Sequence, residues 1–280
     1  MPTKNQKLRF SHARINMEIK YIDIHSHLNL NPLKDDREGV IRRMVENEVG
    51  TITIGVDYET SKEAVEIAEK FDFIWAGVGQ HPADNIEEEF DLEKYKELGK
   101  NPKVVCIGEC GLDYYRDQSD LVKARQEKLF RQHIELALVL NKPLMIHARP
   151  SKGSMDAYND VLNILETFKK DNPDLCANFH FFVGNIDIAK KILELGFTIS
   201  FDGPITFARE YDEVIKFIPL TSIMAETDAP FAAPVPYRGK TCEPYMVVEI
   251  IKKIAELKNL PVEEVQIQIL SNARNYIICK

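Results

Sequence analysis

One sequence feature limits the fold more than any other: a short apolar, β-branched run followed by a longer polar stretch recurs along the whole chain. The apolar runs cover Tyr21–His27, Thr51–Val56, Phe73–Gly79, Val104–Glu109, Pro143–His147, Ala177–Phe182, Phe197–Phe201 and Ile223–Thr227. Strands that are apolar almost throughout are typical of a parallel sheet that is covered on both faces. The repeat therefore predicts an α/β fold.

The stretches between these runs carry apolar residues at helical spacing. The expected helices cover Arg37–Val49, Thr60–Phe71, Ile86–Gly99, Leu121–Asn141, Asp156–Lys170, Ile186–Leu195, Tyr211–Phe217, Glu243–Lys258 and Pro261–Tyr276. Eight strand–helix units in a chain of this length match a closed (β/α)8 TIM barrel, which typically has ~250 residues. An open doubly wound sheet is the alternative, but it normally shows a glycine-rich first turn, which this sequence lacks.

The N-terminal segment differs in composition from the rest of the chain. Residues 1–19 contain one acidic side chain and the basic residues Lys4, Lys7, Arg9 and Arg14. They lack the apolar core of a secretory signal. We expect residues 1–19 to be a disordered basic extension and residues 20–280 to form a single barrel domain. Met17 offers an alternative start of translation, which an intact mass spectrum of the native protein would decide.

Composition and charge exclude several classes of protein. The hydrophobic fraction of 44% excludes a disordered chain, and no apolar run approaches the ~20 residues that cross a bilayer. The 36 basic and 44 acidic side chains give a net charge of −8, which argues against a large basic face for duplex DNA. The five cysteines are odd in number and widely spread, so we expect reduced thiols and a cytoplasmic location. No obligate protein partner is evident.

Side chains suited to chemistry gather at the ends of the apolar runs. Of the seven histidines, five lie at or just after such an end: His25, His27, His81, His147 and His180. Two acids, Glu109 and Asp228, take similar positions. Because the C-terminal ends of barrel strands converge on one face, we expect these side chains to meet in one active site.

This set of side chains is suited to divalent metal ions. His25 and His27 are two residues apart in a strand, so both point to the same side. Imidazole nitrogens suit transition metals such as Zn²⁺, and carboxylates suit Mg²⁺ and Mn²⁺. The inventory predicts a two-metal site in which Glu109 bridges the ions and Asp228 binds one ion while holding the attacking water. Asp23 lies on the same side of the strand, and we expect it to orient a histidine.

The ends of the runs also carry motifs that resemble those of a known family. The motifs are YIDIHSHL, GVGQHP, CIGECGLDYYR, KPLMIHAR, HFFVG, ISFDGPITF and AETDAPFAAPVPYRGKTCEP. In this order they resemble the TatD-type metal-dependent deoxyribonucleases and hydrolases, within the wider amidohydrolase-like barrels. The resemblance extends from about Tyr21 to Tyr276.

The resemblance implies an activity and a set of ligands. The members of that family typically trim DNA from the 3′ end with Mg²⁺ or Mn²⁺, and some have zinc bound. It implies that Glu109 bridges two ions and that Asp228 binds metal and positions or deprotonates water. The ligand set that it implies is His25 and His27 for one ion, His147 and His180 for the other, with Glu109 and Asp228.

Two motifs depart from the family pattern. The family usually has HCFSG where this chain has HFFVG, which leaves the expected ligand His180 in place. The family's SFSG is replaced by a sequence with Asp202 at the third position. An acid at this place would repel a phosphate unless it faces away from the site or binds metal.

Basic and aromatic side chains after the strand ends are expected to bind a phosphate substrate. The candidates for substrate contact are His81, Tyr114, Arg116, Arg149 and Arg238. Tyr114, Tyr115 and Tyr237 are expected to stack on unpaired bases. A deep barrel mouth admits a strand end more easily than a duplex, so the expected partner is DNA with a single-stranded or frayed 3′ end.

Two other functions remain open at this point. The same site would activate water for hydrolysis of a small ester, lactone or amide. Less favoured is a non-catalytic nucleic-acid-binding protein, because the ligand set is complete.

Overall fold

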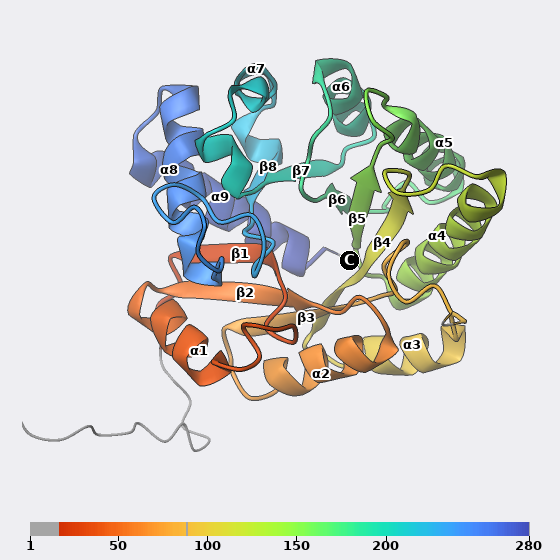
Figure 1. Ribbon diagram of the computed structural model, residues 1–280, viewed down its shortest axis with the longest axis horizontal. Helices are drawn as coiled ribbons and strands as arrows, with labels where there is room; N and C mark the ends of the chain where they lie inside the picture. Colours follow the sequence, from red (N-terminus) through yellow and green to blue (C-terminus); the bar gives the residue numbers. More distant parts are fainter. Residues whose placement is uncertain (1–16, 88, 280) are drawn as a thin grey trace, which may run out of the picture.

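The computed structural model describes residues 17–87 and 89–279, and within them eight strands form one parallel sheet that curls into a barrel (Figure 1). Each strand pairs with the next strand in the chain. The strands are β1 (Tyr21–Ser26), β2 (Val49–Ile54), β3 (Ile74–Val78), β4 (Val104–Asp113), β5 (Leu144–Arg149), β6 (Ala177–Phe179), β7 (Thr198–Phe201) and β8 (Ile223–Ala225). The predicted (β/α)8 barrel is confirmed.

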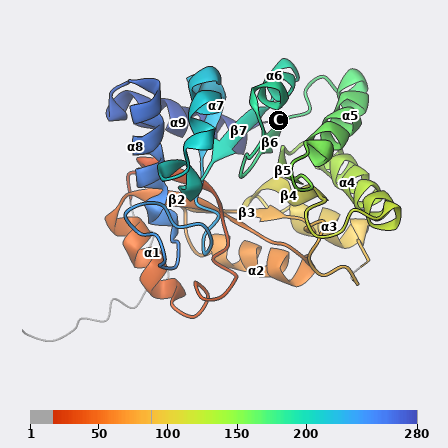
Figure 2. The same cartoon turned by 45° about the horizontal axis from the view of Figure 1, so that its top comes forward.

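Helices cover the outside of the barrel. Figures 1 and 2 show α1 to α8 arranged around the strands in chain order. The described residues form α1 (Arg37–Glu46), α2 (Tyr58–Ala68), α3 (Leu92–Gly99), α4 (Asp120–Leu140), α5 (Asp156–Asp171), α6 (Ile186–Glu194), α7 (Asp212–Phe217), α8 (Val247–Lys258) and α9 (Val262–Ile277). The expected start of α3 at Ile86 is wrong, because the side chain of Asp91 accepts a hydrogen bond from the Lys94 N–H and caps the helix there.

Contacts between β1 and the segment after β8 close the barrel. Ser26 forms a parallel bridge with Ala229, and the His27 N–H donates to the Ala229 carbonyl over 2.7 Å. These contacts bring the last strand-end motif of the sequence beside the first.

Asp23 contributes to this closure and not to the orientation of an imidazole. Its carboxylate accepts hydrogen bonds from the Thr227 N–H at 2.9 Å and the Thr227 hydroxyl at 2.6 Å. It also accepts from the backbone N–H of His25 at 3.2 Å. The expectation that Asp23 orients a histidine ring is therefore wrong, since its described partners are a threonine and a backbone amide.

The core has two layers. The larger layer lies between the strands and the surrounding helices, and the smaller layer fills the barrel itself with side chains such as Ile22, Ile52 and Met224. Helix α9 adds Ala273 and Tyr276 to this inner layer. Because α9 contacts β8 and β1, it closes the N-terminal end of the barrel, which leaves the C-terminal end for the site.

Two cysteines are joined, contrary to the expectation of reduced thiols. Cys176, just before β6, forms a disulfide with Cys279, just after α9. Cys106, Cys110 and Cys242 are free and buried. The disulfide removes the cysteine argument for a cytoplasmic location, which stays a prediction.

Two further expectations concern the chain ends and the membrane. The predicted extension at residues 1–19 falls mostly outside the described residues, and residues 17–20 form neither helix nor strand. Within the described ranges, none of the helices combines the length and hydrophobicity that a membrane crossing requires.

Candidate metal centre

The polar side chains at the strand ends meet in a cavity of about 460 Å³ at the C-terminal end of the barrel. The cavity is lined in part by His27, Glu109, His147, His180 and Asp228. His25 is fully buried and lies against His27 and Glu109. The structure thus brings together all the residues that the sequence predicts as metal ligands.

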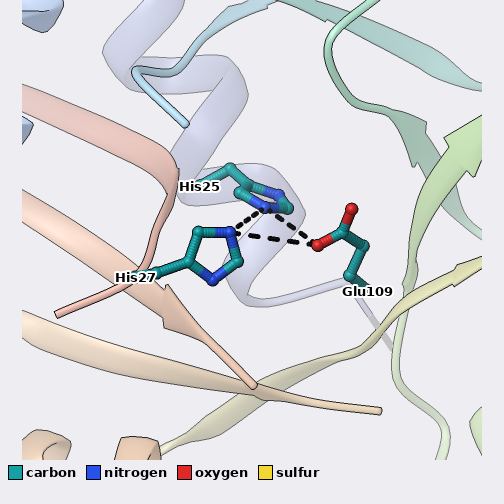
Figure 3. A group of neighbouring side chains, drawn as sticks. All are labelled: His25, His27 and Glu109. Atoms are coloured by element: carbon teal, nitrogen blue, oxygen red, sulfur yellow. Dashed lines mark hydrogen bonds and ion pairs between the residues drawn. The ribbon is translucent and has the colours of Figure 1, made fainter. Parts of the chain in front are cut away.

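Glu109, in β4, joins the histidines into one cluster. Its Oε2 atom lies 3.5 Å from Nε2 of His25 and 3.9 Å from Nε2 of His27. Figure 3 shows the two imidazole rings and the carboxylate pointing toward one another. Its Oε1 atom lies 2.9 Å from Nδ1 of His147 and 2.9 Å from Nε2 of His180. The two oxygens of one carboxylate therefore face two separate pairs of imidazole nitrogens.

A glycine allows β4 to lie close enough to β5 for these contacts. Gly111 has a φ angle of 140°, and a Cβ atom there would lie 2.0 Å from the carbonyl oxygen of His147. Any side chain at this position would push the two strands apart and separate His147 from Glu109.

Asp228, which follows β8, places a second carboxylate beside the first histidine pair. Its Oδ1 atom lies 3.6 Å from Nε2 of His25 and 3.3 Å from Nε2 of His27. Its backbone N–H donates to the His25 carbonyl at 2.9 Å, so the closure of the barrel sets these distances. The Asp228 side chain is 14% exposed, against 6% for Glu109, so it is the more accessible carboxylate from the cavity.

The donor atoms of this cluster fit a divalent cation. Nδ1 of His27 lies 3.0 Å from the carbonyl oxygen of Ile54. A carbonyl only accepts, so this nitrogen carries the proton, and in the neutral ring Nε2 keeps its lone pair. That lone pair faces Nε2 of His25, 3.2 Å away, and Nδ1 of His25 is buried without a hydrogen-bond partner. Nitrogens converging in this way beside carboxylate oxygens form a metal-binding donor set.

The charges within the cluster are strongly coupled. Burial alone would raise the pKa of Glu109, but the charges of His180 and His81 and the hydrogen bonds with His147 and His180 together outweigh burial and bring the pKa well below its usual range. Burial alone would lower the pKa of His180, but the interactions with Glu109 and Glu226 together outweigh burial and raise the pKa well above the usual value. The Glu109 carboxylate is therefore ionised and requires nearby positive charge, which a divalent cation would also supply.

Two carboxylates that sequence analysis did not single out hold the histidine rings from behind. Asp113 Oδ2 lies 3.1 Å from Nε2 of His147. Glu226 Oε1 lies 3.4 Å from Nδ1 of His180. In each ring the other nitrogen faces Glu109. The hydrogen bond with Asp113 orients the ring of His147, as carboxylates behind metal-binding histidines commonly do, whereas Glu226 faces Nδ1 of His180 as an ion-pair partner without a hydrogen bond.

The structure places only some of the residues expected to contact substrate in the cavity. Those that line the cavity are His81, Arg116 and Arg149. The prediction for Tyr114 is wrong, because the residue is fully buried and its hydroxyl donates to Asp160 over 3.1 Å. Arg238 is not among the cavity-lining residues, and its guanidinium lies 3.8 Å from the ring centroid of Phe207.

The three tyrosines expected to stack on bases, Tyr114, Tyr115 and Tyr237, likewise have different environments in the structure. Tyr115 is 53% exposed, with the Arg149 guanidinium 4.0 Å from its ring centroid. Tyr237 packs edge-to-face against Tyr245, with ring centroids 5.8 Å apart. Of the three, Tyr115 alone combines exposure with a neighbour that lines the cavity.

His81 presents a hydrogen-bond donor to the cavity. Its Nδ1 atom accepts from the N–H groups of Ala83 at 3.2 Å and Asp84 at 3.1 Å. Burial lowers the pKa of His81 to about 4, so the ring is neutral at pH 7 and carries its proton on Nε2. That atom lies 3.6 Å from Glu109 Oε1.

Asp202 does not add an acid to the cavity surface. The residue is 3% exposed and is absent from the cavity lining. Burial raises the pKa of its carboxyl well above the usual value. Asp202 is therefore not placed on the cavity surface, where the sequence analysis expected it to repel a phosphate.

Comparison with known proteins identifies the family. Residues 22–277 match the sequence model of a family described as TatD related DNase. The chain belongs to this family. It is 40% identical over 257 residues to an uncharacterized metal-dependent hydrolase of Bacillus subtilis, YabD, covering 90% of this chain and 96% of that protein. It is 33% identical over 249 residues to an uncharacterized metal-dependent hydrolase of Escherichia coli, YcfH, covering 87% and 90% of the two chains.

Solved structures agree with this assignment. The TatD homologue YJJV of Escherichia coli superposes with a TM-score of 0.81 at 27% identity, covering 94% of this chain and 99% of that chain. A TatD family hydrolase of Entamoeba histolytica has a TM-score of 0.80 at 20% identity, with 94% and 100% covered, and shows the shared fold. The cluster at the barrel mouth and the family together describe a metal-dependent hydrolase of the TatD type.

Proposed function

We propose that this TatD-type hydrolase is a 3′-5′ exodeoxyribonuclease that removes nucleotides from single-stranded or frayed 3′ ends. One observation carries the proposal: the two oxygens of Glu109 face two different histidine pairs on the floor of a cavity with cationic side chains at its rim. Two cations a few ångströms apart suit the in-line displacement at a phosphodiester. The family's description as DNase supports the choice of DNA.

The proposed ligands follow from the contacts. One ion would be held by His25, His27, Asp228 and Oε2 of Glu109, and the other by His147, His180 and Oε1 of Glu109. The carboxylates suit Mg²⁺ or Mn²⁺, and the four histidines would also satisfy Zn²⁺. Two such ions would lower the pKa of water at the site and neutralise charge on the substrate phosphate.

The chain's own residues would orient the substrate and move protons. The oxygen of a water forms a bond to phosphorus, the bond from phosphorus to the 3′ oxygen of the preceding nucleotide breaks, and that oxygen takes up a proton. Asp228 is the more exposed carboxylate beside the first histidine pair, so we assign it the proton that the water loses. His81 would donate from Nε2 to a phosphate oxygen, and Arg116 and Arg149 would attract the strand.

The size of the cavity favours a strand end over a duplex. A volume of about 460 Å³ is of the order of one nucleotide, and the walls rise from the loops after the strands. A 3′ end can enter such a space, whereas an intact duplex must fray first.

The second candidate is hydrolysis of a small ester, lactone or amide. It is favoured by the apolar residues that share the cavity lining, Leu30, Val56 and Phe231 among them. Those residues would accept an uncharged substrate, and the same metal cluster would activate water for attack at a carbonyl.

The deciding experiment uses metal-stripped protein and single-stranded DNA labelled at either end. Mg²⁺, Mn²⁺ and Zn²⁺ are added separately, with Asp228→Asn beside the wild type. We expect 5′-labelled DNA to shorten stepwise from its 3′ end, only with metal and not in the variant. Asp187→Asn, on an 83% exposed side chain of α6, is the matched control and should keep full activity. No cleavage with any metal, despite measured metal binding, would favour the small-molecule candidate.

A further inference from the structure

The cavity has two walls of opposite chemistry on either side of the metal cluster. One wall is apolar: Phe231 follows β8, Leu30 follows β1 and Val56 follows β2. The other wall carries the cationic side chains, Arg116 after β4 and Arg149 at the end of β5, with Phe181 and Val183 after β6 beside them. Since neighbouring strands in the barrel are neighbours in the chain, each wall is continuous and the two are separated by the floor of histidines and acids.

Phe231 stands out in the apolar wall because its ring is exposed. The residue is 52% exposed, yet its ring lies 6.3 Å from the ring of the proposed ligand His27, centroid to centroid, at an interplanar angle of 67°. An exposed aromatic ring beside a polar cluster has no role in packing the core, and its open face is available to a flat ligand.

The backbone fixes the position of this ring. The Phe231 N–H donates to the carbonyl of Asp228 at 2.9 Å, so the ring and the proposed proton acceptor belong to one turn. The turn rests against Gly203, where a Cβ atom would lie 1.8 Å from the carbonyl oxygen of Ala232. The backbone that carries the ring is therefore held at a set distance from the metal cluster.

The cationic wall is held in a similar way. The Arg149 guanidinium lies 4.0 Å from the ring centroid of Tyr115, which restricts it to the rim of the cavity. The Arg116 guanidinium lies 3.9 Å from a carboxylate oxygen of Asp84, and its side chain is 69% exposed. Both heads remain accessible to an anion arriving at the mouth.

The charge pattern of a 3′ end matches this division. The terminal nucleoside of a strand with a free 3′ hydroxyl carries no phosphate beyond the one that links it to its neighbour. The rest of the strand carries one negative charge per nucleotide. When the linking phosphate lies over the metal cluster, an uncharged base must lie on one side of it and a polyanion on the other.

We propose, on the basis of the proposed nuclease function, that Phe231 forms the subsite for the base of the 3′-terminal nucleotide, while the strand leaves over Arg116 and Arg149. The enzyme then recognises a terminal base by stacking and not by its hydrogen-bonding edge. Every base has a stacking face, so the subsite requires a base but tolerates its identity.

The test removes the base from the substrate and the ring from the enzyme in turn. Two single-stranded oligodeoxynucleotides of equal length end in either a normal 3′ nucleotide or an abasic one. First-cleavage kcat/KM is measured in Mn²⁺ for the wild type, Phe231→Ala, Phe231→Tyr and Arg149→Gln. We expect the wild type to lose about 5- to 150-fold on the abasic end, the range for one stacked base.

The variants separate stacking from other effects. Phe231→Ala should lose a similar factor on the normal end and nothing further on the abasic end, whereas Phe231→Tyr should keep the base effect. Arg149→Gln should weaken both substrates equally and keep the base effect.

Two outcomes would overturn the subsite, and they differ from each other. If Phe231→Ala lowers cleavage of both ends by the same factor, the ring supports the turn and does not contact the base, although the nuclease function stands. If the wild type cleaves neither end with any divalent cation, the nuclease function itself fails and the base subsite falls with it.

Discussion

At the C-terminal end of the barrel, histidines and carboxylates lie buried beside one another, and several of their polar atoms find partners only within the cluster. At the N-terminal end, α9 closes the barrel with apolar contacts, and its buried polar groups are paired. The Tyr276 hydroxyl donates to the Leu144 carbonyl at 3.0 Å, and the Asn272 amide donates to the carbonyls of Leu220 and Ile223.

The difference shows where this molecule places stability and where it places chemistry. Burying ionisable groups destabilises a folded chain unless something compensates their charge. Packing alone therefore does not explain the buried histidines and carboxylates at the C-terminal end of the barrel. The apolar contacts and paired polar groups around α9, at the N-terminal end, can supply the stability that the C-terminal end lacks. Substitutions at the two ends should therefore change different measured quantities.

Glu109→Gln should give the largest effect on activity. The variant keeps the size of the side chain but removes the negative charge that faces both histidine pairs. We expect kcat/KM to fall on the order of 10³-fold or more and Mn²⁺ binding to weaken. Kinetics and calorimetric titration with Mn²⁺ measure these two quantities.

Glu63→Gln is the control for this variant, since Glu63 pairs with Lys34 and Arg37 away from the cavity. It should leave kcat/KM and Mn²⁺ affinity unchanged. Full activity and metal content in Glu109→Gln would show that Glu109 does not bridge two ions.

Tyr276→Ala should have the opposite profile. The residue is 6% exposed and packs inside the barrel, so truncation should cost about 3–5 kcal/mol of unfolding free energy, as for other large buried aromatic residues. Below the unfolding transition, kcat/KM should match the wild type. Tyr276→Phe keeps the ring and loses the hydroxyl, which donates to the Leu144 carbonyl and also contacts the Cys106 thiol, so it should cost about 1 kcal/mol in urea titrations. A loss of activity without a loss of stability would contradict the division between the two ends.

How far the sequence alone predicts this division is clear from particular residues. The recurring apolar runs predict the barrel, and the position of polar side chains at the ends of these runs predicts that residues as distant in the chain as His25 and Asp228 converge. They do not show which face of a loop is buried, so they predict Tyr114 as a base contact although it lies inside the protein. Side-chain partners depend on the register between strands, so the sequence pairs Asp23 with a histidine, whereas its partner in the structure is Thr227.

The acids behind the histidines had a usable signal in the sequence. Asp113 ends the strand that contains Glu109, and Glu226 precedes Asp228 by two residues. The strand expected from the apolar run ends at Glu109. In the structure β4 continues to Asp113, paired with Arg149 of β5. The contact between Cys176 and Cys279, far apart in the chain, had no local signal.

His133 is a buried histidine outside the metal cluster, and its titration should affect the stability of the fold. In α4 its Nε2 accepts from the Gln80 N–H at 2.9 Å, and its Nδ1 donates to the Leu129 carbonyl at 2.9 Å. Burial lowers the pKa of His133 to about 4, from an unfolded value of about 6.5. Protonation therefore favours the unfolded chain, and stability should fall by up to about 3 kcal/mol as the pH drops from 6.5 to 4.

The comparison is between wild type and His133→Gln, by urea unfolding at pH 7 and pH 4.5. Other groups titrate in both proteins, so the informative quantity is the difference between their losses. We expect the wild type to lose more free energy than the variant over this interval. Equal losses would mean that His133 does not titrate on unfolding.

Asp113→Asn should have the smallest effect and the most specific one, because it changes the cluster without removing a proposed ligand. As a carboxylate, Asp113 accepts from Nε2–H of His147, so that the Nδ1 atom facing Glu109 could give up its proton and offer a lone pair to a metal ion. An asparagine can donate to Nε2, which would move the imidazole proton onto Nδ1 and oppose metal binding. We expect Mn²⁺ affinity or kcat/KM to fall about 10- to 100-fold, with no change in unfolding free energy in metal-free buffer beyond about 1 kcal/mol.

Asp117→Asn provides the matched control for this effect. Asp117 lies in the same β4–α4 connection, and its carboxylate accepts from the Ser119 N–H at 2.8 Å on the exposed surface. It should keep the affinity for Mn²⁺ and the activity of the wild type. If Asp113→Asn also keeps both, the ring of His147 is oriented by β5 alone, and the metal cluster does not depend on acids behind its histidines. If the affinity falls in Asp113→Asn only, the mouth depends on acids behind its histidines in a way that the paired groups around α9 do not.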